Sequence, residues 1–371
     1  MIYNDLPKTS LSAELKDSSH KYKLSNLLLL FLDFHTSEDQ FATLKENKFK
    51  NCNLIETIND LNHYGYELNI PETAAEYRTQ VYPALMEIHA KAGYYGVQVP
   101  LGGIPFDKDG MLTHETMSMI LQQIAIIRSA GLNISAVGGS WDADWTQCIK
   151  PQAQAASIMG SKYLYGPFST PFLLFPQQAS SGQASAEWLM QHHLNFQKVF
   201  NDEIGPYLYS LGITMSEEPL QRFERMPARL RECTKLALSE GMDNFTVMID
   251  TCHEFADGQG PEAYRHHVKQ LADANKLSGA HISAVHRGKI YESWFNQQFF
   301  NDFFGPLFQH GFDGVIAIET FDAIEPVVEV AKVNRKKFSH PIGVMINQLH
   351  YSTSMLQNVE AHMLESSYLN I

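Results

Sequence analysis

A repeating unit runs along the sequence from about residue 74 onward: an amphipathic helical stretch, then a glycine, then a short apolar run. The unit is clearest where apolar residues recur at three- and four-residue spacing over Met117–Ile127, followed by Gly131 and by the apolar run Leu132–Val137. Glycine is a common helix stop, and a short apolar run after it is typical of a buried strand in a parallel sheet. The unit therefore predicts alternating helices and parallel strands.

The number of repeats favours a closed barrel. Seven strands are predicted after glycines, and an apolar run near the start of the chain adds one more; the eight are Asn26–Leu32, Tyr95–Val99, Leu132–Val137, Tyr163–Tyr165, Ile213–Met215, Phe245–Ile249, Ala280–Ser283 and Val315–Ile318. Eight helix–strand units predict an α/β protein with a (β/α)₈ barrel, which takes roughly 250 residues before additions. An open doubly wound sheet is the alternative, but no GxGxxG or GxxxxGK[ST] pattern follows the first strand.

Three segments fall outside the repeat. Residues 1–20 are polar and are expected to form a loose N-terminal arm, which leaves 21–371 as a single barrel domain. Residues 36–72 form an insertion after the first strand, longer than a usual connection. The stretch Val344–Leu369 is expected to be a helix that completes the outer ring.

Charge and cysteine content narrow the partners. The formal net charge of −13 repels a phosphate backbone, so no nucleic-acid partner is expected. The four cysteines form no CxxC pair, which favours reduced thiols and a cytoplasmic location. The start of the chain lacks a signal-peptide pattern, and the apolar run Leu27–Leu32 is far shorter than the roughly 20 residues that span a bilayer. No membrane partner is expected.

Metal-binding residue types stand near the ends of the last four predicted strands. They are Glu218, Asp250, His281 and Glu319, spaced 32, 31 and 38 residues apart, or about one βα unit each. Because the active site of such a barrel lies at the carboxyl ends of its strands, these side chains should converge. A single acid there is usually a helix cap or a solvated residue, but three carboxylates buried together without a cation would be costly. An oxygen-rich set with one imidazole suits Mn²⁺, Mg²⁺ or Co²⁺.

Other polar and aromatic residues are weaker candidates for the same pocket. His35 follows the first predicted strand and is a candidate substrate-binding residue, although a histidine there is often structural. Trp141 is a candidate wall of a sugar pocket, as are Trp145 and Trp188, although tryptophan is more often a core residue.

Several motifs resemble those of the ketose 3-epimerases, the D-tagatose and D-psicose 3-epimerases of the xylose isomerase-like barrel superfamily. The segment Glu218-Pro-Leu-Gln-Arg-Phe-Glu224 resembles their Glu-Pro-Leu-Asn-Arg-Phe-Glu, and Asp250-Thr-Cys-His253 resembles their Asp-Thr-Phe-His. The remaining matches are His281 with Arg287 six residues later, Glu319-Thr-Phe, and the turn Tyr165-Gly-Pro-Phe168. Gln98 departs from the pattern, because many relatives carry Glu there, and the first 75 residues match no part of it.

The resemblance implies a xylose isomerase-like TIM barrel with one divalent ion, Mn²⁺ or else Mg²⁺, Co²⁺ or Zn²⁺, held by the four ligands named above. It implies that Glu218 and Glu319 also serve as acid and base, and that Glu224, His253 and Arg287 bind sugar oxygens near C1 to C3. The reaction would be proton transfer next to a ketone through a metal-stabilised enediolate, most naturally ketose 3-epimerisation in carbohydrate metabolism. The expected partners are a small sugar and further copies of the chain, as a dimer or tetramer.

Other functions use similar residues. Proton transfer between C1 and C2 would give aldose–ketose isomerisation, and expulsion of water from the enediolate would give a keto-sugar or inosose dehydratase. An endonuclease IV-like phosphodiesterase needs three zinc ions and histidines at early strand ends, whereas here those strands end in Pro100-Leu-Gly and Gly138-Gly-Ser. A non-catalytic metal- or sugar-binding barrel would be free to lose one ligand, and none is missing.

Overall fold

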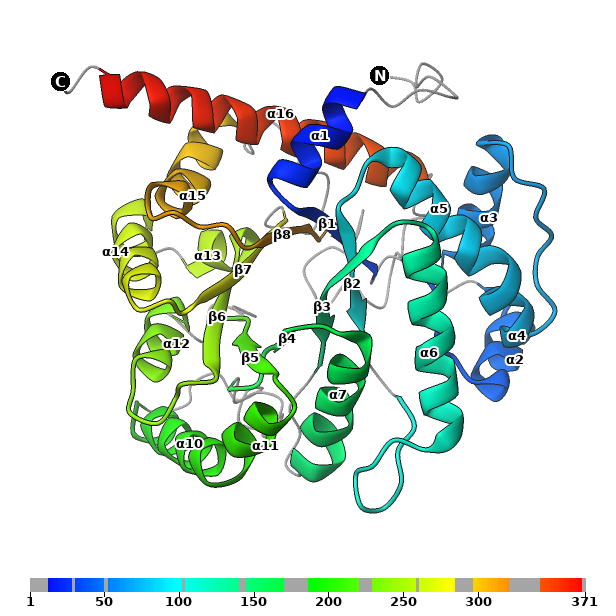
Figure 1. The fold of residues 1–371 in the computed structure, drawn as a ribbon, viewed down its shortest axis with the longest axis horizontal. Coiled ribbons are helices and arrows are strands. Elements are labelled where there is room, and N and C mark those ends of the chain that lie inside the picture. Colours follow the sequence, from blue (N-terminus) through cyan, green and yellow to red (C-terminus); the bar gives the residue numbers. More distant parts are fainter. Residues whose placement is uncertain are drawn as a thin grey trace.

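Eight parallel strands close into a barrel in the order β1 to β8, as expected from the sequence (Figure 1). The computed structural model describes residues 13–28, 31–49, 53–101, 104–139, 145–169, 186–219, 229–257, 260–283, 296–319 and 341–368. The strands are β1 (Leu24–Leu27), β2 (Gly96–Pro100), β3 (Asn133–Gly138), β4 (Tyr163–Gly166), β5 (Thr214–Glu217), β6 (Phe245–Asp250), β7 (Leu277–Ile282) and β8 (Val315–Ile318). The ring closes where β1 pairs in parallel with β8.

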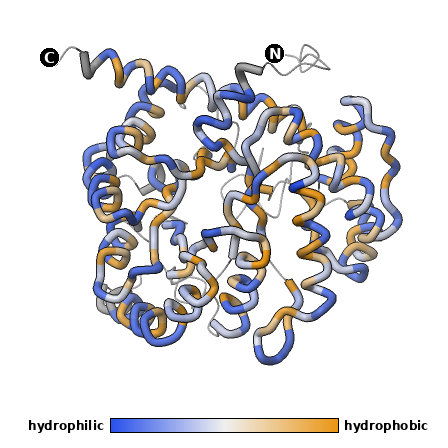
Figure 2. Tube along the Cα trace, viewed as in Figure 1, coloured by the Kyte–Doolittle hydropathy of each residue, from blue (hydrophilic) through white to orange (hydrophobic). Residues whose placement is uncertain are grey.

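Helices surround the barrel as an outer layer (Figure 1). They are α5 (Tyr82–Ala92), α6 (His114–Ser129), α7 (Trp145–Met159), α10 (Ala186–Val199), α11 (Gly205–Ser210), α12 (Arg229–Ala237), α14 (Gly260–Asp273), α15 (Gln297–Gln309) and α16 (Pro341–Tyr368). Figure 2 shows hydrophilic and hydrophobic segments alternating along these helices, as expected when one face of each helix is buried. A short further helix, α13 (Thr251–Asp257), follows β6 directly.

Local sequence explains where these helices begin and end. The Thr113 hydroxyl accepts a hydrogen bond from the Thr116 amide and so caps the start of α6. Gly93 ends α5 with a φ of 98°, a left-handed conformation that glycine adopts without steric cost. On α15, the rings of Phe299 and Phe303 stack with centroids 4.4 Å apart, which adds to the buried aromatic surface of that helix.

The insertion after β1 consists of helices packed outside the barrel beside α5. These are α2 (Glu38–Glu46), α3 (Leu54–His63) and α4 (Ala74–Glu76), and a π-helical turn over Tyr77–Val81 joins α4 to α5 (Figure 1). The Glu38 carboxylate accepts hydrogen bonds from the backbone amides of Ala74 and Ala75, which ties the start of α2 to that of α4.

The two ends of the described chain pack against each other. The expected loose arm is, over its described part, the helix α1 (Ala13–Lys21), which lies across α16 (Figure 1). Tyr22 donates a hydrogen bond of 2.7 Å to Glu360 of α16, and Lys21 forms an ion pair with the same carboxylate. α16 itself packs against α15 and α3 and completes the ring, as expected. None of the helices in the described ranges has the length and apolar character needed to cross a membrane.

Candidate metal centre

Four side chains from the last four strands meet in one buried cluster. Asp250 ends β6 and His281 lies within β7, while Glu218 and Glu319 directly follow β5 and β8. Each offers a nitrogen or oxygen atom, and these four atoms all lie within 4.8 Å of one another. The local backbone is held by the sheet, since the Glu218 and Glu319 amides donate to carbonyls of the neighbouring strands β4 and β7. The convergence expected from the residue spacing is confirmed.

His281 lies at the middle of this cluster. Its Nδ1 atom is 2.9 Å from Glu319 Oε2 and 3.7 Å from Glu218 Oε1. Its Nε2 atom faces the other way and lies 2.8 Å from the amide oxygen of Gln98 on β2. The Tyr165 ring, at the end of β4, meets the imidazole edge-on with centroids 5.4 Å apart. The ring is therefore held on two sides while Nδ1 faces the carboxylates.

Asp250 is oriented by its own helix and by the next strand. Its Oδ1 atom accepts hydrogen bonds from the Ser283 hydroxyl at 2.6 Å and from the Cys252 amide at 2.8 Å. The amide bond makes Asp250 the cap of α13 as well as the last residue of β6. The Oδ2 atom lies 3.5 Å from His253 Nε2, which is also 3.5 Å from Glu218 Oε1. His253 thus touches two of the four candidate ligands.

The protonation of the cluster follows from its charges. Burial alone would raise the pKa of the Glu218 carboxyl, but His253 and His281 hold it well below its usual range. Burial opposes charging of the His281 ring, yet Glu319 and Glu218 raise its pKa to about 10. Burial and the same two carboxylates raise the pKa of Tyr165 well above its usual value, so its phenol stays protonated. The Glu218 carboxylate is therefore ionised at neutral pH although it is buried.

This donor set fits a divalent cation. Ligand atoms on opposite sides of an ion at roughly 2.1 Å lie roughly 4.2 Å apart, so atoms within 4.8 Å of one another need only a small inward movement. Three carboxylate oxygens and one imidazole nitrogen suit a hard or borderline ion, and such an ion would offset the buried negative charge. Glu218, Asp250, His281 and Glu319 are the residues that could hold it.

The other predicted site residues are distributed unevenly. His253 lies against the cluster, whereas Glu224, Arg287 and Trp141 lie outside the described residues. His35 is buried beneath α6, where its Nε2 atom is 3.1 Å from the Gln123 side chain, and its role in substrate binding stays a prediction.

The two weaker tryptophan candidates add nothing to the described centre. The Trp145 indole donates to Glu203 and packs edge-on against Tyr207 of α11, in the outer helical layer. The Trp188 side chain is outside the described part of the structure.

Sequence reasoning missed four supporting residues. Gln98 and Ser283 bind ligand side chains, and Tyr165 packs against His281. Glu217 points toward the helical layer, where its carboxylate accepts hydrogen bonds from the amide and hydroxyl of Ser169 and so fixes the turn after β4. Strand alternation could have shown that Glu217 and Glu218 face opposite sides, but no short-range pattern announces the other contacts.

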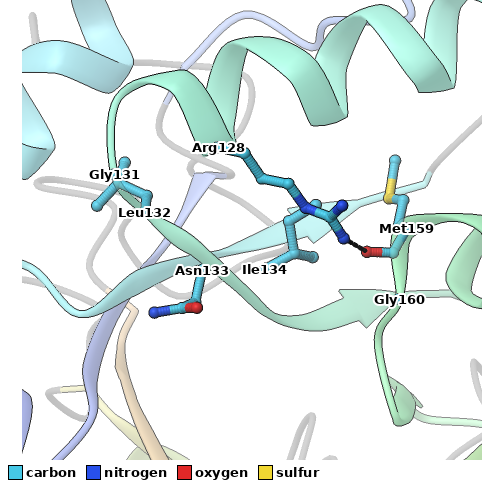
Figure 3. Close-up of a pocket in the computed structure, with 7 residues that line it drawn as sticks. All are labelled: Arg128, Gly131, Leu132, Asn133, Ile134, Met159 and Gly160. Atoms are coloured by element: carbon cyan, nitrogen blue, oxygen red, sulfur yellow. Dashed lines mark hydrogen bonds between the residues drawn. The ribbon is translucent and has the colours of Figure 1, made fainter.

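A separate hollow of about 390 Å³ lies where β3 begins, at the opposite end of the barrel (Figure 3). Among the described residues of its lining, Arg128 is the one ionisable group, and its guanidinium donates to the Met159 carbonyl at 3.4 Å. Other lining residues come from the turns after α6 and α7, including Gly131 and Gly160. Barrel active sites lie at the carboxyl ends of the strands, so the buried cluster and not this hollow is the candidate active site.

Comparisons with known proteins agree with the barrel fold described above. Residues 86–337 match the family model described as the xylose isomerase-like TIM barrel. No curated protein matches the chain significantly.

Solved structures share the fold at low sequence identity. A proposed sugar phosphate isomerase/epimerase from Anabaena variabilis is similar with a TM-score of 0.66, 18% identity, and coverage of 91% of this chain and 98% of that one. A D-psicose 3-epimerase solved with D-fructose gives 0.57 at 14% identity, covering 76% and 97%. An L-ribulose 3-epimerase gives 0.54 at 16% identity, covering 78% and 93%.

Proposed function

This chain belongs to the xylose isomerase-like TIM barrel family, and from that premise we propose that it is a divalent-metal-dependent sugar isomerase that inverts C3 of a ketose. The observation that carries the proposal is the cluster of Glu218, Asp250, His281 and Glu319, whose ligand atoms all lie within 4.8 Å of one another. Two of the structurally similar proteins are described as ketose 3-epimerases, which supports a ketose substrate. Four of the motifs that resemble those of ketose 3-epimerases each contain one of these four residues.

The positions of the two glutamates support a role for them in proton transfer on opposite faces of the sugar. Glu218 follows β5 and Glu319 follows β8, so two other strands separate them around the rim. Inversion of a carbon centre needs one group to take its proton on one face and another to return a proton on the opposite face. The low pKa of Glu218 keeps its carboxylate ionised at neutral pH, as a base requires. A positioned acid or base of this kind contributes about 10²–10⁴-fold to the rate.

The remaining groups assist that transfer. When bound, a divalent cation supplies Lewis-acid stabilisation of the negative charge that develops on the sugar oxygens. Asp250 and His281 would hold that ion, and His253 would donate a hydrogen bond to the sugar or to Glu218, from which its Nε2 atom is 3.5 Å away. Glu224 and Arg287 are proposed to bind the sugar oxygens near C1 to C3, as the resemblance to ketose 3-epimerases implies.

Deuterium exchange tests the proposal. The Mn²⁺-loaded protein is incubated in D₂O with fructose, psicose, tagatose, ribulose and xylulose, and each sugar is followed by NMR. We expect deuterium at C3 of at least one ketose, with the exchange rate reduced about 10²–10⁴-fold in Glu319→Gln. Glu360→Gln is the matched control, because it makes the same chemical change on α16, where Glu360 pairs with Lys21.

The position of the label separates the neighbouring functions. Deuterium at C1 would replace the proposal with an aldose–ketose isomerase. Loss of water from the sugar without epimer formation would indicate a dehydratase. Stoichiometric metal binding with no exchange in any sugar would contradict a ketose isomerase and leave a binding barrel.

A further inference from the structure

One hydrogen bond crosses the barrel interior to reach a candidate metal ligand. The amide oxygen of Gln98 lies 2.8 Å from His281 Nε2, and both side chains are almost completely buried. Gln98 belongs to β2 and His281 to β7, which are not neighbours in the order of the strands. The contact therefore links the early half of the barrel, strands β1 to β4, to the late half, strands β5 to β8, which carries the candidate ligands.

The packing around Gln98 leaves its amide little freedom. On β2, Gln98 is in register with Leu27 of β1 and Ala136 of β3, and these two neighbours belong to one buried cluster with Tyr165 and Met248. The register between β2 and β3 shifts just before Gln98, and an irregularity of this kind can re-aim a side chain beside an active site. Gln98 itself is 1% exposed.

The chemistry of the two groups determines which imidazole nitrogen is offered to the cluster. A neutral imidazole has one nitrogen that donates and one that accepts, and an amide oxygen only accepts. Nε2 of His281 must then carry the hydrogen that Gln98 accepts. In the cluster without a cation, Nδ1 carries the second proton of the charged ring; a bound cation would take the place of that proton and use the lone pair of Nδ1. That atom is the one facing Glu319 and Glu218, at 2.9 and 3.7 Å.

We propose that Gln98 is a positioning residue that fixes the ring orientation and tautomer of His281, so that Nδ1 is the nitrogen presented to a divalent cation. The inference rests on the proposed metal-dependent function and adds a role for the early half of the barrel. Partners of this type commonly orient metal-binding histidines. An amide does so without adding a fourth carboxylate to a centre that already holds three.

Two substitutions of similar size distinguish the hydrogen-bond acceptor of Gln98 from the volume that its side chain fills. Gln98→Met keeps the volume and removes the strong acceptor, whereas Gln98→Glu keeps an acceptor in the same place. Gln123→Met is the matched control, because Gln123 is a second buried glutamine that contacts a histidine, His35, away from the cluster. Calorimetric titration with Mn²⁺ gives the Kd of each variant. NMR of the ¹⁵N-labelled, Zn²⁺-loaded protein shows which nitrogen of His281 carries the proton.

We expect Gln98→Met to weaken metal binding about 10- to 100-fold and to lose a solvent-protected Nε2–H signal of His281. Gln98→Glu and Gln123→Met should each keep the Kd and the Nε2–H signal close to those of the unmodified protein. An unchanged Kd and Nε2–H signal in Gln98→Met would overturn the positioning role alone, as would a proton found on Nδ1 of His281 in the Zn²⁺-loaded unmodified protein. If the unmodified protein bound no metal, the proposed function and this inference would both be overturned.

Discussion

The two halves of the barrel rim hold different kinds of side chain. The strands from β5 to β8 each supply one candidate ligand to the buried cluster. The strands from β2 to β4 supply neutral groups near the same interior: the amide of Gln98, the Tyr165 ring, and glycines at the ends of β3 and β4. The late half thus supplies the charged groups of the cluster, and the early half supplies neutral groups that hydrogen-bond to them or pack against them.

Histidines show the difference most directly. Burial is the main cause that lowers the pKa of His35 and of His89 to about 4, and both lie in the early half. His281 is equally buried, but Glu319 and Glu218 overcome the effect of burial and raise its pKa to about 10. Similar burial therefore has opposite outcomes, and the neighbouring carboxylates decide which one applies.

Glycines of the early half make room for the tyrosine that packs on His281. A Cβ atom added at Gly138 would lie 2.7 Å from the Tyr165 hydroxyl, closer than such atoms approach in proteins. At Gly166 it would lie 2.3 Å from the backbone oxygen of Gly139. A side chain at the end of β3 or β4 would collide with the tyrosine ring or the backbone, which explains why, among the described residues, these two strand ends supply no candidate ligand.

Removing one carboxylate from the late half should have the largest effect on metal affinity. Asp250→Asn is expected to weaken Mn²⁺ binding well over 100-fold, because a direct ligand should matter more than a partner of a ligand, which is worth about 10- to 100-fold. The metal-dependent rise in melting temperature should vanish with it. In the unmodified protein, Mn²⁺ at 100 times its Kd should stabilise the fold by about 2.7 kcal/mol. Calorimetric titration and thermal melting measure the two quantities.

The matched control is a carboxylate of the early half. Asp33 follows β1. Burial raises the pKa of its carboxyl to about 6, although the hydrogen bond that the His35 amide donates to it acts to lower that pKa. Asp33→Asn should leave the Kd for Mn²⁺ within about twofold, a difference of less than about 0.4 kcal/mol. If the two variants lost affinity equally, the assignment of metal binding to the late half would be wrong.

The fold was largely predictable because its signals are local. Glycine after an amphipathic stretch marked seven of the eight predicted strands, and the resulting barrel is confirmed, although Gly279 lies within β7 (Leu277–Ile282) and not before it. The first strand was misplaced: Asn26–Leu32 was expected, but β1 is Leu24–Leu27. The apolar run continues past the sheet because residues such as Phe31 and Phe34 are buried beyond the end of β1, and hydrophobicity alone does not separate such a segment from a strand.

The site was predictable only in part, for a physical reason. The proximity of the four candidate ligands was predictable because strand ends of a barrel converge, so spacing along the chain translates into proximity. Gln98 and Ser283 were not found, because their roles depend on side-chain contacts with His281 and Asp250 that leave no periodic pattern. Gln98 was noted only as a departure from the relatives, and the structure supplies its hydrogen-bond partner.

Acid should destabilise the early half through its buried histidines. His89 Nδ1 donates to the Leu85 carbonyl at 2.7 Å, and Nε2 accepts from the Asn26 amide at 3.0 Å, an arrangement that requires the neutral ring. Its folded-state pKa of about 4 lies below the ordinary 6.5, so the unfolded chain takes up the proton first. The stabilisation is complete above pH 6.5 and is lost as the pH falls toward 4, by up to about 3 kcal/mol.

Urea unfolding between pH 8 and pH 4 tests this expectation. His89→Gln should be less stable at neutral pH, yet its free energy of unfolding should fall less steeply below pH 6.5. Parallel curves for the variant and the unmodified protein would show that His89 is not the group that takes up the proton.

The smallest expected effect concerns the support of Asp250. Ser283→Ala removes the 2.6 Å hydrogen bond to Oδ1, but the Cys252 amide still donates to the same atom. The Kd for Mn²⁺ should therefore rise only about tenfold, at the lower end of what partners of a ligand contribute. Ser135→Ala on β3 is the matched control, since that hydroxyl donates to the Val97 carbonyl and not to a candidate ligand. A loss as large as that of Asp250→Asn would mean that Ser283 is itself a ligand, and no loss would mean that the helix cap alone orients Asp250.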